Sequence, residues 1–249
     1  MIGFRVPCTM IDSSFLYQYF KLFDFIEVKV KKQYDFLSLQ KELNSDCLGK
    51  WSIHLPKRML YDESEFNTAM QILECINNCK VYPLNVVTHF YGYESEMISK
   101  LRKLRKKIPK EVEICLENIQ TYNTKYIDEL EYVIHRLEKE NISICIDLGH
   151  LMYGGMKLGY TQIELIKMLK SKRSICKNVK EIHIHDFNLQ TDHITLSKGK
   201  LDRLMLCELF QFLPIVPIII ETNVRKADED GLMQVSWVKE ILNYEDSEN

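Results

Sequence analysis

Four short apolar segments of this sequence end in side chains that can bind a metal ion. They are the stretches ICLEN (114–118), ICIDLGH (144–150), IHIHD (182–186) and IIIET (218–222). Each places a carboxylate or an imidazole directly after a run of apolar residues, which is the pattern of a buried strand. Carboxylate oxygens and imidazole nitrogens are common ligands of divalent cations. Four such segments in one chain therefore predict side chains that converge on a metal.

The elements that must position these residues alternate between strands and helices along the whole chain. Strands are predicted over about residues 2–6, 25–30, 51–55, 84–89, 112–117, 142–147, 181–185 and 216–221. Helices are predicted over about residues 13–22, 36–44, 63–78, 94–107, 126–139, 162–170, 202–212 and 229–242, with a long loop after Asp147. Eight such units without a linker predict one domain over 1–249, a (β/α)8 TIM barrel with a polar tail from about residue 243. An open doubly wound sheet is the alternative, but the sequence has no GxGxxG or GxxxxGK[ST] turn.

In a barrel of this kind the C-terminal ends of all strands open onto one face, where active sites are built. Six polar residues fall at or near these ends: Glu117, Asp147, His183, Glu221, His54 and His89. An apolar core would not tolerate so many polar groups without a partner. A divalent metal would neutralise the carboxylates and accept the imidazoles.

Composition and charge narrow the class of protein. The net charge of −2 over 249 residues gives no overall attraction to nucleic acid or to an acidic membrane. The N-terminus lacks the pattern of a signal peptide, and the most apolar run, residues 212–220, is too short to span a bilayer. The eight cysteines form no CxxC pair and are interpreted as buried, reduced thiols. A cytoplasmic protein is expected.

Several of these segments resemble the xylose-isomerase-like TIM barrels, a superfamily of sugar isomerases and epimerases that also contains the endonuclease IV group. The matching pieces are Leu116-Glu117-Asn118, Asp147-Leu148-Gly149-His150, His183-Ile184-His185-Asp186, His193-Ile194-Thr195-Leu196 running into Gly199, and Glu221-Thr222-Asn223. The resemblance implies one divalent metal (Mn, Mg, Co or Zn) held by Glu117, Asp147, His183 and Glu221. It also implies that Glu117 and Glu221 act as acid and base on a sugar or sugar phosphate.

The first hypothesis is therefore a metal-dependent isomerase or epimerase of carbohydrate metabolism. Proton abstraction beside a metal-bound carbonyl would give an enediolate. The alternative is a zinc-dependent abasic-site endonuclease with two or three zinc ions, and only this alternative has a nucleic-acid partner. A third hypothesis is a metal-stabilised barrel without catalysis. His54, His89, His150 and His193 would contact substrate under the first hypothesis and bind additional zinc under the second.

Two departures bear on this choice. The endonuclease branch has an Asp-x-His pair on the seventh loop, but here Thr191 stands two residues before His193 and Asp192 is adjacent to it. Ser197 stands where the superfamily usually has a first glycine before Gly199. The first departure and the short loop between His183 and His193 favour the isomerase branch.

Some residues near the strand ends have other expected roles. His185 is expected to point toward the helices and to be structural. Lys57, Arg58 and Arg225 are candidate ligands of a phosphate. The sequence leaves a homo-oligomer open.

Overall fold

The computed structural model describes the chain except residues 34–35, 38, 40–48, 120–125, 223–228 and 244–249. Eight parallel strands close into a barrel in the order in which they occur along the chain. They are β1 (Ile2–Pro7), β2 (Phe25–Lys29), β3 (Lys50–His54), β4 (Asn85–Phe90), β5 (Glu113–Asn118), β6 (Ile142–Asp147), β7 (Val179–Ile184) and β8 (Ile218–Ile220). The prediction of a single (β/α)8 barrel is confirmed.

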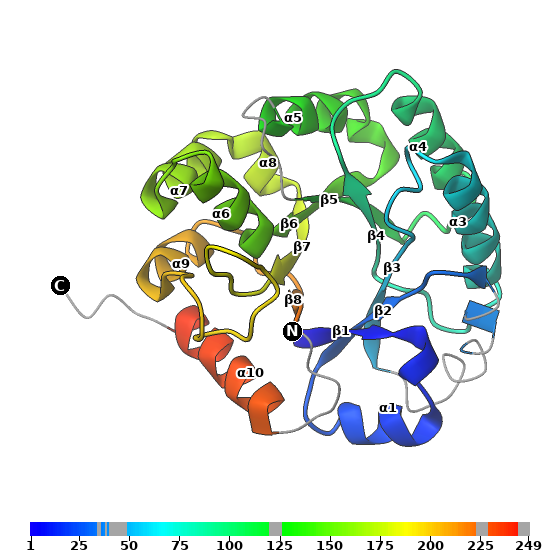
Figure 1. Cartoon of the computed structure of the whole chain (residues 1–249). Coiled ribbons are helices and arrows are strands. Elements are labelled where there is room, and N and C mark those ends of the chain that lie inside the picture. Colours follow the sequence, from blue (N-terminus) through cyan, green and yellow to red (C-terminus); the bar gives the residue numbers. More distant parts are fainter. Residues whose placement is uncertain (34–35, 38, 40–48, 120–125, 223–228, 244–249) are drawn as a thin grey trace.

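Helices surround the barrel on the outside (Figure 1). They are α1 (Ser13–Tyr19), α3 (Glu63–Ile76), α4 (Met97–Arg105), α5 (Tyr126–Arg136), α6 (Leu148–Lys157), α7 (Gln162–Ser171), α8 (Arg173–Lys177), α9 (Arg203–Phe210) and α10 (Glu229–Leu242), with short 3-10 turns at Cys8–Met10 and Glu138–Glu140. The helix predicted over residues 36–44 falls largely outside the described residues. In the described ranges no helix is long and apolar enough to cross a membrane.

The two faces of the strands differ in character, as alternation along a strand requires. Residues such as Phe4, Trp51 and Ile144 belong to the main apolar core and are at most 3% exposed. Val87, Cys115 and Cys145 form a separate, fully buried apolar cluster. The barrel also holds buried polar side chains, which are described with the site below.

One prediction about the fold is wrong. The stretch after β6, expected to be a loop, is the helix α6, and His150 lies in its first turn. The Asp147 carboxylate caps this helix because its Oδ1 accepts a hydrogen bond of 2.7 Å from the backbone N–H of His150. Three glycines lower the helix propensity of the LGHLMYGGMK segment, so the sequence alone pointed to a loop.

All seven cysteines in the described part of the chain are buried. This agrees with their interpretation as small apolar core residues. Cys47 lies outside the described residues.

Candidate metal centre

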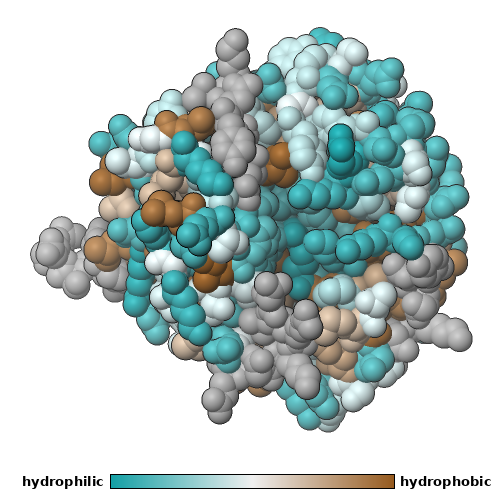
Figure 2. Space-filling model, viewed as in Figure 1, coloured by the Kyte–Doolittle hydropathy of each residue, from teal (hydrophilic) through white to brown (hydrophobic). Residues whose placement is uncertain are grey.

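The residues predicted at the strand ends do gather on one face of the barrel. Seen in the direction of Figure 1, hydrophilic residues surround the middle of this face (Figure 2). The metal-binding atoms of these residues form three adjacent groups, and a fourth group of Cys145, Glu181 and His183 shares His183 with one of them. Within each group the atoms lie within 4.8 Å of one another. All three groups include residues that the sequence singled out.

The first group consists of His54 at the end of β3, His89 on β4 and Glu117 on β5. Oε2 of Glu117 lies 2.8 Å from Nε2 of His54 and 3.2 Å from Nε2 of His89. Nδ1 of His54 lies 3.0 Å from the carbonyl oxygen of Leu55, which can only accept a hydrogen bond. Both ring nitrogens of His54 thus face oxygens that only accept, so a cation bound at Nε2 would leave the ring proton on Nδ1.

The second group is the predicted quartet of Glu117, Asp147, His183 and Glu221. Nδ1 of His183 lies 3.0 Å from Oε1 of Glu117 and 2.5 Å from Oε1 of Glu221. All four residues are at most 3% exposed. The structure thus brings these four side chains together from β5, β6, β7 and the end of β8, and that they hold a metal stays a prediction.

The third group consists of His150, His185, Asp192 and His193. Nε2 of His150 lies 3.6 Å from Oδ2 of Asp192, and Nδ1 of His193 lies 3.1 Å from Oδ1 of Asp192. The rings of His185 and His193 stack with centroids 4.1 Å apart. Although Asp192 is one position away from the Asp-x-His spacing, its carboxylate still reaches this group.

The expectation for His185 was wrong. Nε2 of His185 lies 3.2 Å from Oδ1 of Asp147, so the ring reaches the site while it packs against α6. Residues two apart on a strand share a face, so His185 continues on the side of His183. A Cβ atom at Gly149 would lie 2.3 Å from the His185 ring, so only glycine leaves room for this ring beside α6.

The loop after β7 bends sharply to bring His193 back to the site. His193 and Ser197 both have positive φ angles, 56° and 72°, in the left-handed region that favours glycine. This explains why a glycine is usual at the position of Ser197. An antiparallel bridge between Asp186 and Ile194 closes the loop, and Asp186 accepts hydrogen bonds from the N–H groups of Gly199 and Leu201.

The three groups fit bound cations. Among the described residues, Oδ2 of Asp147 and Oδ2 of Asp192 are buried and have no hydrogen-bond donor, whereas Oε1 of Glu221 forms an ion pair with the Arg5 guanidinium. Each of the two aspartate oxygens lies within 3.6 Å of a histidine nitrogen, yet the geometry is not that of a hydrogen bond. Buried carboxylate oxygens without partners are costly. A divalent cation between oxygen and nitrogen would satisfy both.

Arg5 on β1, which the sequence analysis missed, reaches into the middle of the site. Its guanidinium pairs with Glu27 on β2 and with Glu221, and one nitrogen lies 3.5 Å from Oε1 of Glu117. The same nitrogen lies 2.9 Å from Nδ1 of His183. Arg5 is only 9% exposed, so its charge offsets the buried carboxylates around it.

Two further buried carboxylates lie on the other side of His183. Nε2 of His183 lies 3.1 Å from Oε1 of Glu181 and 3.1 Å from Oε2 of Glu27. Ser52 and Asn85 hold Glu181 in place with hydrogen bonds of 3.1 and 2.6 Å. The signal that could have revealed these residues is a charge inside an apolar strand: FRV for Arg5, FIEVK for Glu27 and KEIHI for Glu181.

The electrostatics keep most carboxylates at the site ionised. Burial alone would raise the pKa of Glu221, but the Arg5 guanidinium and His183 hold this pKa well below its usual range. Burial also opposes ionisation of Glu27, and Arg5 beside it lowers the pKa to about 2.

For His89, burial lowers the pKa to about 3, so the ring is neutral at pH 7. Despite burial, the neighbouring carboxylates instead raise the pKa of His183 and His185, and that of His193 to about 10. A metal binds the ionised carboxylates and neutral imidazoles, so a cation at these three histidines would displace protons.

The candidate phosphate ligands Lys57 and Arg58 follow β3 and are exposed beside the first group. They line a cleft that is described further below. Arg225 lies outside the described residues.

Comparison with known proteins places this site in context. Residues 63–240 match the family model described as xylose isomerase-like TIM barrel. Over 123 residues the chain is 27% identical to a probable endonuclease 4 of Mycoplasmopsis synoviae (strain 53), and the match covers 45% of this chain and 44% of that protein. The chain thus matches less than half the length of this relative.

Two solved structures share the fold at low sequence identity. One is a sugar phosphate isomerase/epimerase from Parabacteroides distasonis (9% identity, TM-score 0.52, covering 96% of this chain and 93% of that one). The other is the probable 3-DHS dehydratase AsbF from Bacillus anthracis (12% identity, TM-score 0.59, covering 98% and 100%). Since the family model spans most of the chain and includes the ends of β4 to β8, the chain belongs to the xylose isomerase-like TIM barrel family.

Proposed function

We propose that the protein is a multi-metal phosphodiesterase that cleaves DNA at abasic sites. One observation carries this proposal: two carboxylates each lie between neighbouring groups of ligands. Oε2 of Glu117 faces His54 and His89 while its Oε1 faces His183. Oε1 of Glu221 faces His183 while its Oε2 lies 3.4 Å from Nε2 of His193. Carboxylates shared in this way support several cations side by side.

Adjacent cations suit the hydrolysis of phosphate esters. Divalent cations held there would act as Lewis acids on phosphate oxygens and would acidify a water molecule. A single-metal isomerase needs only the quartet around His183. It gives no ligand role to His54 and His89, or to the group of His150, His185, Asp192 and His193. The number of buried donors therefore favours the hydrolase.

The chain's own residues would fix the positions of the cations and of the substrate. Glu117 and Glu221 would hold neighbouring cations at a constant separation. His54 is oriented by its hydrogen bond to Leu55, and His150 is held by α6, whose first turn is capped by Asp147. Fixed ligands of this kind bind cations in one geometry. The partial similarity to a probable endonuclease 4 supports the same class of reaction.

The test is a nicking assay on an end-labelled duplex with one abasic site, using zinc-loaded protein. We expect cleavage at the abasic position and not in a matched intact duplex. Glu117→Gln should lower the rate by at least a hundredfold, because it disturbs two groups at once. Glu113→Gln changes the same residue type on the same strand, but Glu113 contacts Ser143, so this variant should stay active. An intact abasic duplex with two or more zinc ions bound per chain would refute the proposal.

The isomerase or epimerase of the first hypothesis is the second candidate. The observation in its favour is that Oε1 of Glu117 and Oε1 of Glu221 both lie within 3.0 Å of the same histidine nitrogen. Two carboxylates around one cation could serve as base and acid for a bound sugar. Turnover of an aldose or ketose phosphate by protein with one metal per chain, without nicking of DNA, would favour this candidate.

A further inference from the structure

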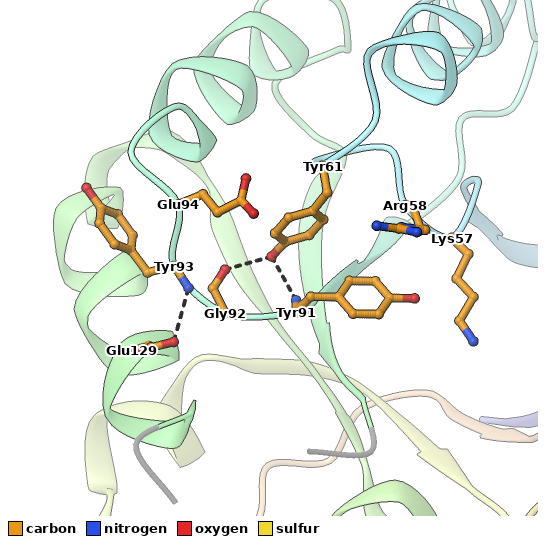
Figure 3. Close-up of a pocket in the computed structure, with 8 residues that line it drawn as sticks. All are labelled: Lys57, Arg58, Tyr61, Tyr91, Gly92, Tyr93, Glu94 and Glu129. Carbon is orange, nitrogen blue, oxygen red and sulfur yellow. Dashed lines mark hydrogen bonds between the residues drawn. The ribbon is translucent and has the colours of Figure 1, made fainter. Parts of the chain in front are cut away.

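A cleft of about 640 Å³ lies next to the first group of ligands, between the loops that follow β3 and β4. Figure 3 shows its lining, which is Lys57, Arg58, Tyr61, Tyr91, Gly92, Tyr93, Glu94 and Glu129. The centroids of the Tyr91 and His89 rings are 6.0 Å apart. The Tyr91 side of the cleft therefore adjoins the candidate metal centre.

One wall of the cleft is fixed in advance of any ligand. The Tyr61 hydroxyl accepts a hydrogen bond from the N–H of Tyr91 and donates one to the carbonyl of Gly92, both 2.7 Å long (Figure 3). Gly92 has a φ angle of 121°, which only glycine adopts readily. The Tyr61 and Tyr91 rings also pack edge to face at 5.2 Å. A wall that is already ordered loses little entropy when it binds a ligand.

The opposite side of the cleft carries two positively charged side chains. Lys57 and Arg58 are exposed, and no ion pair involves either side chain within the described part of the chain. In Figure 3 the Tyr91 ring extends from its turn toward these two residues. Free cations beside a phenol can take an anion such as a phosphate.

The far end of the cleft offers acceptors instead. Oε2 of Glu129 already accepts a hydrogen bond from the N–H of Tyr93 at 3.1 Å. Glu94 lies beside the Tyr61 ring (Figure 3), and its carboxylate has no ion-pair partner among the residues described. A carboxylate in this place suits a ligand that presents N–H or amino groups.

We propose that this cleft binds one nucleotide unit of the substrate. Lys57 and Arg58 hold its phosphate, the exposed face of Tyr91 stacks on its base, and Glu94 accepts from the amino edge of that base. Aromatic rings and cations arranged in this way bind single nucleotides through stacking and charge. The inference rests on the proposed phosphodiesterase and adds a preference for a substrate with a base beside the cleaved bond.

The test compares two probes that carry the same phosphate, dAMP and 2-deoxyribose 5-phosphate, by calorimetry on the full chain as purified. Any bound metal ions contribute equally to the affinity for the phosphate of both probes. The difference between the two affinities therefore measures the contribution of the base. We expect dAMP to bind at least fivefold more tightly, and Tyr91→Ala to remove this advantage. Tyr160→Ala is the matched control, since Tyr160 is 39% exposed and does not line the cleft.

The double variant Lys57→Ala/Arg58→Ala should weaken both probes about tenfold. Lys103→Ala/Lys106→Ala makes the same change in net charge on and just after α4 and should weaken neither. Equal affinity for the two probes, no measurable binding, or a loss of affinity in the control variants would overturn the inference. Neither probe contains a phosphodiester bond, so a failure here is distinct from a failure of the nicking assay.

Discussion

The two ring nitrogens of His183 face different carboxylates. Nε2 lies 3.1 Å from Oε1 of Glu181, inside the barrel, while Nδ1 lies 3.0 Å from Oε1 of Glu117 at the candidate metal centre. The surrounding carboxylates raise the pKa of His183 despite its burial, so the ring tends to hold a proton on each nitrogen. A cation at Nδ1 would displace the proton there, and Glu181 would accept a hydrogen bond from the proton left on Nε2. Glu181 would thereby orient His183 as a metal ligand without binding the metal itself.

This relationship predicts the effect of Glu181→Gln. The new amide can donate to Nε2, which would favour the tautomer with its proton on Nδ1, the wrong side for a metal. Loss of such a partner typically costs 10- to 100-fold in metal affinity. We expect a loss in this range for the most tightly bound zinc ion, measured by competition with a chromophoric chelator.

The control for this experiment is Glu113→Gln, since Glu113 bonds Ser143 and no residue of the site. Its zinc affinity should match that of the unmodified protein. Unchanged zinc affinity in Glu181→Gln, with native circular dichroism, would show that Glu181 plays no part in orienting His183.

The close approach of Gly149 to His185 predicts a local effect of a methyl group. Gly149→Ala would push a Cβ atom into the His185 ring, and Gly155→Ala on the same helix would push one into the Leu165 side chain. Both should destabilise the fold by about 1–3 kcal/mol in urea unfolding. Only Gly149→Ala should also lower zinc content, because only it moves a residue of the third group. Equal zinc content in the two variants would contradict this placement of His185.

The thiols provide a prediction about pH. Burial raises the pKa of both Cys79 and Cys176 to about 11, so these groups remain thiols, and not reactive thiolates, at pH 8. A disulfide reagent at pH 8 should therefore leave Cys79 and Cys176 unlabelled in the folded protein and label both in guanidinium. The labelling rate of these two thiols in the folded protein should rise only as the pH approaches 11. Rapid labelling of either thiol at pH 8 would be inconsistent with the buried core.

Bound zinc should stabilise the fold through Glu117. Zinc at a hundred times its dissociation constant adds about 2.7 kcal/mol per site. In a chain of this length that raises the melting temperature by roughly 5–10 °C. Glu117→Gln should lose most of this increment in differential scanning fluorimetry, whereas Glu113→Gln should keep it. The same zinc-dependent shift in both variants would argue against Glu117 as a ligand.

The sequence was sufficient to predict the barrel and to place the four residues of the quartet at strand ends, while their role as metal ligands stays a prediction. Runs of Ile, Val and Cys predict the strands. Once the strands are assigned, Glu117, Asp147, His183 and Glu221 fall at or near strand ends. The sequence was insufficient where a contact depends on the conformation of a loop. Whether His193 and Asp192 reach the site depends on the turn of the loop after β7, with its two positive φ angles.

Buried charges within strands were also overlooked. Arg5, Glu27 and Glu181 lie in strands whose remaining residues include Ile and Val, and a charged residue among these does not change the strand assignment. Their importance appears only when the register of the barrel places Arg5 beside Glu27. The helix α6 was missed because its glycines, one of which makes room for His185, resemble a loop.

The most direct test of the account is the metal content per chain, measured by elemental analysis on protein purified without chelator. Three adjacent groups of buried ligands predict two or three zinc ions per chain. His89→Ala should lose one ion and Glu117→Gln should lose more than one, since Glu117 belongs to two groups. One metal per chain, unchanged in His89→Ala, would contradict the multi-metal centre and favour the single-metal isomerase instead.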